Sequence, residues 1–311
     1  MAAVRERAHY SHAGRRRANQ DAALERTLPD GRELLAVADG MGGHRAGEIA
    51  SARALEALSR RMETGAGLIE AVRAANADVH SDASRSAELQ GMGTTLVALL
   101  HDSSGYEIAN VGDSRAYRID EAGIRQLTRD HSFTAEAMRA GTMSSQEAAT
   151  SPWRNALTRA LGTEAEVEID LFGPFPAEPP HVVLLCSDGL YKAVPEALIR
   201  EYVLATEDLD TAVHSLAALA FRNGSDDNIT AAALELGSLP RRPATITLPV
   251  PINRQTSTAK QPPVRQRRPE PQPAPPPSPG NARRPTAYIQ LALLLLLLAA
   301  VLGLLWTLLA E

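Results

Sequence analysis

The feature that most constrains this 311-residue chain is a set of apolar, strand-like runs that meet an aspartate. Asp39 closes "ELLAVAD", Asp113 closes "IANVGDS" and Asp188 closes "VLLCSDG"; Asp227 opens the last run in "SDDNIT", and Asp21 precedes an apolar patch in "NQDAAL". One acid at a strand end is usually a turn former. Five of them at one edge of a sheet would converge and repel one another unless cations neutralised them. The sequence therefore predicts a buried carboxylate cluster.

The spacing of the apolar residues predicts an α+β fold. Groups of strand-like runs are separated by pairs of helical patterns, which is typical of packed antiparallel sheets with helices outside. The short gaps between 94–101, 106–114 and 116–120 predict an antiparallel meander. The expected strands are 33–39, 94–101, 106–114, 116–120, 181–189 and 228–236, and the expected helices are 47–62, 66–82, 195–205 and 209–222.

The donor types in the predicted cluster favour a hard cation. Carboxylate oxygens without cysteine or an ordered set of histidines select ions such as Mg²⁺ or Mn²⁺. The one cysteine, Cys186, lies in an apolar run and is expected in the core. After Asp39 the glycines of "DGMGG" would let the backbone approach closely, so that the Gly40 carbonyl could add another oxygen ligand. A tight, flexible turn is the alternative interpretation of these glycines.

Composition divides the chain at about residue 239. Of the 21 prolines, 14 lie in 239–287, a stretch without an aromatic residue. Such a segment cannot bury a core and is predicted to be a disordered linker, leaving 1–238 as the folded domain. Residues 1–240 carry a net charge of −12, whereas 241–287 carry +8. An acidic folded domain argues against a nucleic-acid partner, because lysine and arginine supply most of that affinity.

Residues 288–310 form a run of 23 residues without a charge. This is long enough to span a hydrocarbon core as a helix, so we expect a C-terminal transmembrane helix. Arg283 and Arg284 precede it, and positive residues favour the cytoplasmic side. The N-terminus has no apolar central region and is not expected to be a signal peptide. Together these features predict a cytoplasmic domain held at the membrane by a single C-terminal anchor.

Seven short motifs, in order, resemble those of the metal-dependent type 2C serine/threonine protein phosphatases, most closely the bacterial form. They extend over about residues 8–236, which is essentially the whole folded domain. The motifs are "RxxNQD" (16–21), "DGMGGHRAGE" (39–48), "GMGTT" (91–95), "VGDSRAY" (111–117), "LTRDHS" (127–132), "CSDGL" (186–190) and "SDDNIT" (225–230).

The resemblance implies a four-layer α-β-β-α sandwich of two antiparallel sheets flanked by helix pairs, with two metal ions between the sheets. It implies that Asp39, Asp188 and Asp227 hold the two ions together with the Gly40 carbonyl, and that Asp21 contacts a metal-bound water. Asp113 matches the position of a third-metal ligand, shared with Asp188. The metal residues implied are thus Asp39, Gly40, Asp113, Asp188 and Asp227, with two or three ions of Mn²⁺ or Mg²⁺.

The same resemblance places a phosphate-binding arginine at Arg16, although the spacing to the preceding glycine leaves Arg15 and Arg17 as alternatives. Met41 stands where eukaryotic relatives carry a histidine proposed as general acid, so that role is open between His44 and a metal-bound water. Residues 133–155 match the family's variable flap.

The implied activity is hydrolysis of phosphoserine and phosphothreonine by a metal-activated water. The implied substrates are phosphorylated proteins, and the phosphatase would oppose a Ser/Thr kinase. One alternative is a catalytically silent membrane scaffold that binds phosphoproteins, which the presence of Asp39, Asp188 and Asp227 disfavours. Another is a dimetal hydrolase of small phosphate esters or diesters. Ser187 lacks the "GxSxG" context of a nucleophile.

Overall fold

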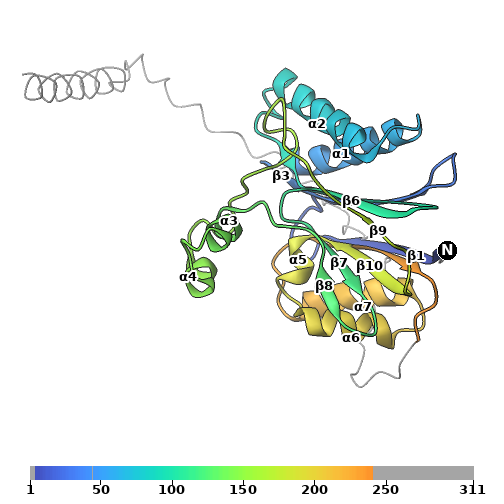
Figure 1. The fold of residues 1–311 in the computed structure, drawn as a ribbon. Coiled ribbons are helices and arrows are strands. Elements are labelled where there is room, and N and C mark those ends of the chain that lie inside the picture. The colour runs from blue at the N-terminus through green and yellow to red at the C-terminus, as the bar shows by residue number, and fades with distance from the viewer. Residues whose placement is uncertain (1–3, 44, 241–311) are drawn as a thin grey trace, which may run out of the picture. The chain divides into compact units, whose positions relative to one another are not determined.

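The computed structural model describes residues 4–43 and 45–240, which form two antiparallel sheets with helices on their outer faces (Figure 1). The first sheet has the strand order β1 (Val4–His12), β11 (Ile229–Leu236), β10 (His181–Cys186), β7 (Arg115–Ile119) and β8 (Ile124–Gln126). The second has the order β2 (Asp21–Thr27), β3 (Glu33–Met41), β5 (Leu96–Asp102), β6 (Gly105–Val111) and β9 (Asp170–Phe175), and the short β4 (Gly93–Thr94) pairs with the end of β3.

Each sheet is covered by a pair of helices. Helices α1 (Ala46–Met62) and α2 (Leu68–Arg85) pack on the second sheet, and α6 (Glu196–Ala205) and α7 (Leu209–Arg222) pack on the first (Figure 1). Helix α1 buries Ala50, Ala54 and Ala57, whose small side chains allow its backbone close to the sheet. The predicted α+β fold, with two antiparallel sheets between helix pairs, is confirmed.

A third apolar core fills the space between the two sheets. Val37 and Val97 of the second sheet and Leu185 and Leu234 of the first are among its fully buried members. Because the interior strands are covered on one face by helices and on the other by the opposite sheet, their sequences are apolar almost throughout. Every residue of β10 and β11 is buried. Cys186, the last residue of β10, is buried in the core between the first sheet and its helices, as expected.

The predicted antiparallel meander is correct for its first two strands and wrong for its third strand. Strands β5 and β6 pair with each other, but β7 belongs to the other sheet and pairs with β10 and β8. The chain crosses between the sheets at Gly112–Ser114. Gly112 has a φ of +101°, and a Cβ there would lie 2.6 Å from Cγ2 of Thr95. Glycine therefore permits the sharp crossing, which leaves Asp113 at the boundary between the sheets.

Sequence periodicity missed the four edge strands β1, β2, β8 and β9. Edge strands are half solvated, so polar and charged residues interrupt their apolar pattern. In β1 only Ala8 and Tyr10 are buried within "VRERAHYSH". The six strands that the sequence did predict are the interior ones.

Three short helices complete the described chain. Helices α3 (Phe133–Arg139) and α4 (Ser145–Thr150) lie in the segment predicted as a flap and stand beside the layers in Figure 1. Ser132 and Ser144 cap them through side-chain hydrogen bonds to backbone N–H groups. Helix α5 (Asp188–Tyr191) follows β10 directly, so Asp188 begins a helix after Ser187 rather than ending a strand.

The folded part continues to Leu239, which is buried against the first sheet and its helices. The rest of the predicted linker, 241–287, and the predicted membrane helix, 288–310, lie outside the described residues. Among the helices within 4–43 and 45–240, none is long and apolar enough to cross a membrane.

Candidate active site

The strand register brings the candidate aspartates to one end of the two sheets. Asp21 and Asp39 are direct partners across β2 and β3. Asp113 follows β6, whose last residue pairs with the first residue of β5. In the first sheet, Cys186 at the end of β10 pairs with Ala231 near the start of β11, so Asp188 and Asp227 also lie at a common end.

These five carboxylates are near enough to interact through their charges. The pKa of Asp39 is raised well above its usual value by burial and then by the charges of Asp21, Asp188, Asp113 and Asp227. Burial and, after it, the charge of Asp188 raise the pKa of Asp113 to about 6. Burial and the charge of Asp188 also raise the pKa of Asp227. Bringing these acids together costs free energy, which a bound cation would offset.

Among the five aspartates, Asp21 is fixed in position by neighbouring hydroxyl groups. Burial raises its pKa to about 7, against hydrogen bonds from Ser187 and Thr230 that lower it. The Ser187 hydroxyl donates to Oδ2 of Asp21 at 2.7 Å and accepts from the Thr230 N–H at 3.1 Å. Ser187 thus orients Asp21, which gives this serine a structural role and agrees with its rejection as a nucleophile.

Two carboxylate oxygens of the cluster fit a cation. Oδ1 of Asp21 and Oδ1 of Asp188 are buried and have no hydrogen-bond partner. Unpaired buried oxygens of this kind are rare and need an explanation, such as an ion. In the described part of the chain no three His, Cys, Asp or Glu side chains gather closely enough to hold a metal by themselves. A cation here would therefore also need backbone oxygen or water as ligands.

The backbone at Gly40 packs too tightly for any other residue. A Cβ on Gly40 would lie 2.0 Å from the carbonyl oxygen of Gly47, in the first turn of α1, and 2.7 Å from that of Gln20. The Gly40 N–H donates to the Gln20 carbonyl at 3.1 Å. The glycine after Asp39 thus allows three chain segments to pack closely together, and it does not form a flexible turn. Its predicted role as a carbonyl ligand stays a prediction.

Of the three candidate arginines, Arg16 lies at the cluster. Its guanidinium donates to Oδ2 of Asp227 and to the carbonyl oxygen of Asp226, both at 2.8 Å. Arg15 instead lies over the Phe221 ring, 5.7 Å from its centroid. Arg16 also lines a groove of about 290 Å³ together with Asp188, Lys192, Asp227 and residues of the flap.

The sequence missed several residues that build the site. Asn228 accepts from the Gln20 N–H and donates to the carbonyls of Ala13 and Ala18, which fixes the loop that carries Arg16. Thr95 accepts from the Asp39 N–H at 2.9 Å. Both residues lie inside the quoted motifs, but only the fold shows which backbone groups they hold.

The identity of the general acid stays a prediction, because His44 lies outside the described residues. Met41, which stands at the position of the histidine of eukaryotic relatives, pairs with Gly93 at the end of β3. His131 is a buried, hydrogen-bonded residue. It accepts from the Gly112 N–H through Nδ1 at 3.1 Å, and its Nε2 lies 3.3 Å from Asp170.

Two further arginines near the site are paired with acids that are not among the five candidate aspartates. Arg115 forms a bidentate pair with Asp130, and Arg159 pairs with Asp170 and Glu168.

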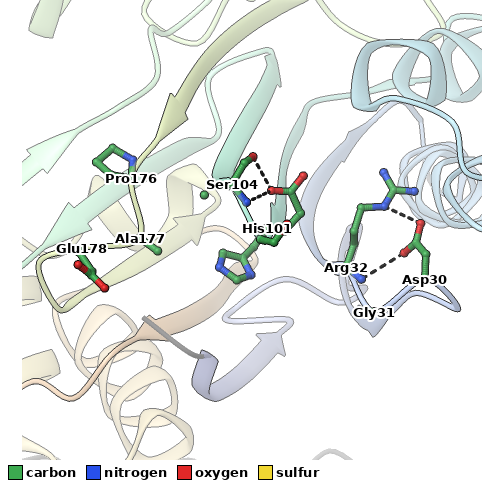
Figure 2. Close-up of a pocket in the computed structure, with 11 residues that line it drawn as sticks. Asp30, Gly31, Arg32, His101, Ser104, Pro176, Ala177 and Glu178 are labelled. Atoms are coloured by element: carbon green, nitrogen blue, oxygen red, sulfur yellow. Dashed lines mark hydrogen bonds and ion pairs between the residues drawn. The ribbon is translucent and has the colours of Figure 1, made fainter. Parts of the chain in front are cut away.

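A second groove, of about 780 Å³, lies at the β2–β3 turn, the far end of that hairpin from Asp21 and Asp39 (Figure 2). None of the candidate site residues lines it. Asp30 is already paired with Arg32 (Figure 2). Asp102 accepts a hydrogen bond from the Ser104 hydroxyl. Its charged groups thus stabilise turns, and it shows no cluster of chemically reactive residues.

The raised pKa of Asp21 predicts a pH-dependent stability in the absence of metal. Between the usual carboxyl value of 3.8 and about 7, the folded protein holds a proton at Asp21 that the unfolded chain releases. Stability from this group is therefore lost as pH rises towards 7. In EDTA, the free energy of unfolding of the wild type relative to Asp21→Asn should fall from pH 5 to pH 8. Urea unfolding at each pH measures it; a difference independent of pH would contradict the assignment.

Comparison with known proteins places this geometry in a family. The profile described as "Protein phosphatase 2C" matches residues 9–226. The serine/threonine phosphatase stp of Listeria innocua is 39% identical over 216 residues, covering 66% of this chain and 85% of the relative.

Solved structures agree in fold and in sequence. The serine/threonine phosphatase Stp1 from Staphylococcus aureus has a TM-score of 0.69 and 33% identity, over 76% of this chain and 97% of its own. The catalytic domain of PstP, solved with two manganese ions, has a TM-score of 0.65 and 32% identity, over 75% of this chain and 98% of its own. The chain therefore belongs to the protein phosphatase 2C family of serine/threonine protein phosphatases.

Proposed function

We propose that this chain hydrolyses phosphoserine and phosphothreonine in proteins and that it does so with divalent cations, Mn²⁺ or Mg²⁺, held by the aspartate cluster. The observation that carries the proposal is the pair of buried, unpartnered oxygens on Asp21 and Asp188. They lie among acids whose pKa values are raised by burial and by one another. The family relation and the manganese ions in the PstP structure support this choice of cofactor.

Each part of the site has a separate role in this proposal. Arg16, at the edge of the groove, binds the phosphate, since a guanidinium matches two phosphoryl oxygens. The Ser187 hydrogen bond fixes Asp21, which accepts a proton from the attacking water. Asp39, Asp188, Asp227 and the Gly40 carbonyl would hold the ions. When bound, the ions supply positive charge that activates water and offsets the charge on the phosphate.

Phosphate release from a phosphoserine or phosphothreonine peptide tests the proposal directly. Activity should require Mn²⁺ or Mg²⁺ and be abolished by EDTA. A p-nitrophenyl phosphate assay and a phosphodiester assay run in parallel separate the alternatives. Faster turnover of the diester would favour a different dimetal hydrolase, and metal-loaded protein that binds phosphopeptide without hydrolysing it would favour a scaffold.

Arg16→Ala should lower kcat/KM for a phosphopeptide by about 10- to 100-fold, the effect of losing one charged hydrogen-bonding group to the phosphate. Arg15→Ala is the matched control because Arg15 packs on Phe221. Its effect should be at least tenfold smaller. Steady-state kinetics measure both, and an equal loss in the two variants would reject Arg16 as the phosphate ligand.

We further propose that 288–310 anchors the protein in a membrane with the catalytic domain in the cytoplasm, where it opposes a Ser/Thr kinase. The support is the uncharged run of 23 residues and the preceding Arg283 and Arg284. A reporter fused before Met1 should be active only as a cytoplasmic protein, and the full chain should fractionate with membranes. A periplasmic or lumenal reporter signal would reject the orientation, and a chain that remains in the soluble fraction would reject the anchor.

A further inference from the structure

A single lysine stands beside the aspartate cluster. Lys192 and Lys260 are the only lysines in the chain, and Lys192 is the one within 1–240; every other Lys/Arg position there is arginine. Lysine carries a compact point charge on a flexible stem, whereas arginine is planar and extended. A lysine is therefore the better substitute for a spherical cation.

The ammonium of Lys192 occupies one oxygen of Asp188. Nζ lies 2.6 Å from Oδ2 of Asp188, the first residue of α5, whose C-cap residue is Lys192. The other oxygen, Oδ1, is buried and has no partner. The two oxygens of Asp188 are thus divided: one faces the cluster and is available to a metal, and the other is held by the ammonium.

Asp113 lies beside the residue that precedes Lys192, since Oδ2 of Asp113 is 3.5 Å from the Tyr191 hydroxyl. The neighbouring Tyr191 donates its hydroxyl to the Asp113 carbonyl at 3.1 Å, which ties Asp113 to α5. Lys192 also donates to Oδ1 of Asn155 in the flap at 3.2 Å.

We propose that the ammonium of Lys192 supplies to Asp113 and Asp188 the positive charge that a third divalent ion would otherwise supply, so that the cleft binds two divalent ions and not three. The inference rests on the proposed function, because it presumes that the cluster binds metal. Lys192 would then set the number of ions that the cleft binds. Asp113 would interact with the ammonium of Lys192 and would not be a metal ligand.

Counting bound ions tests this inference without reference to activity. Titration calorimetry of the full chain with MnCl₂ should give two ions per wild-type chain. Lys192→Gln, which removes the charge from a side chain that is 42% exposed, should bind one more. Anomalous scattering from Mn²⁺-soaked crystals should place the added ion against Asp113 and Asp188. In wild-type crystals Lys192 should still contact Asp188.

Three further variants make the result specific. Lys192→Arg keeps the charge and should still bind two ions. Arg154→Gln removes a cation from the same groove and should also bind two. The double variant Lys192→Gln with Asp113→Asn should return the count from three to two, because the added ion loses a ligand.

Two outcomes would overturn the inference. One is a third ion at Asp188 in the wild-type protein, and the other is an unchanged count of two in Lys192→Gln. Neither would affect the proposed phosphatase, whose failure appears separately as a wild-type protein that binds Mn²⁺ but releases no phosphate from phosphopeptides. A wild-type protein that binds no Mn²⁺ would overturn both.

Discussion

Asp39→Asn is expected to reduce Mn²⁺-dependent hydrolysis of a phosphopeptide by about a thousandfold or more, since loss of a metal ligand removes several kcal/mol of transition-state stabilisation. The expectation follows from the position of Asp39, which is the carboxylate whose pKa responds to all four of the other clustered acids. Any ion that relieves this repulsion must lie close to it. Asparagine preserves the shape of the side chain but carries no charge.

The same variant has a second, opposite effect on stability. Without metal, removal of one charge from the cluster relieves repulsion, so Asp39→Asn should melt at a higher temperature than wild type in EDTA. Added Mn²⁺ should stabilise the wild type strongly and the variant little, since a ligand stabilises the state that binds it. Differential scanning fluorimetry measures both shifts.

Asp226→Asn is the matched control for this experiment. Asp226 is adjacent to Asp227 and lines the groove that also contains Arg16 and Asp188, but Asp226 is exposed. Its substitution should change activity by less than about threefold. It should change the Mn²⁺-induced shift in melting temperature by less than about one or two degrees. If Asp39→Asn retained full activity, or if both variants lost it equally, the aspartate cluster would not be the metal site.

Gly40→Ala is expected to lower the free energy of unfolding by about 3 kcal/mol or more, because the added methyl would overlap backbone rather than a side chain that can move. It would meet the Gly47 carbonyl oxygen at 2.0 Å and the Gln20 carbonyl oxygen at 2.7 Å. Relief requires β3, the start of α1 and the loop before β2 to separate. Phosphatase activity should fall with stability, since Asp21 and Asp39 adjoin these segments.

Gly43→Ala, in the same glycine-rich stretch, is the control. A Cβ at Gly43 would meet nothing within 4 Å, so its effect on stability should be within about 0.5 kcal/mol. Urea unfolding measures both variants. Equal stability of Gly40→Ala and wild type would mean that the glycines only provide flexibility, which was the alternative interpretation of the sequence.

The interior of the fold was predictable because it obeys a simple rule. Strands covered on both faces must be apolar, so β3, β5, β6, β7, β10 and β11 were visible as apolar runs. The four edge strands were not visible, because solvent on one side permits charges such as those in "VRERAHYSH". The pairing partner of β7 was also hidden, since a short gap in sequence does not reveal that the chain changes sheets at Gly112.

The candidate site divides in the same way. The sequence alone determined which acids adjoin strands, that oxygen is the available donor, and, through seven ordered motifs, which family the chain resembles. Each of these features follows from residue type and from spacing within short segments of the sequence. The tertiary structure decided that Arg16 rather than Arg15 meets Asp227, that Ser187 orients Asp21, and that Lys192 holds one oxygen of Asp188. Apart from the Lys192–Asp188 pair, these contacts join residues far apart in the chain, and only the packing of the two sheets sets their distances.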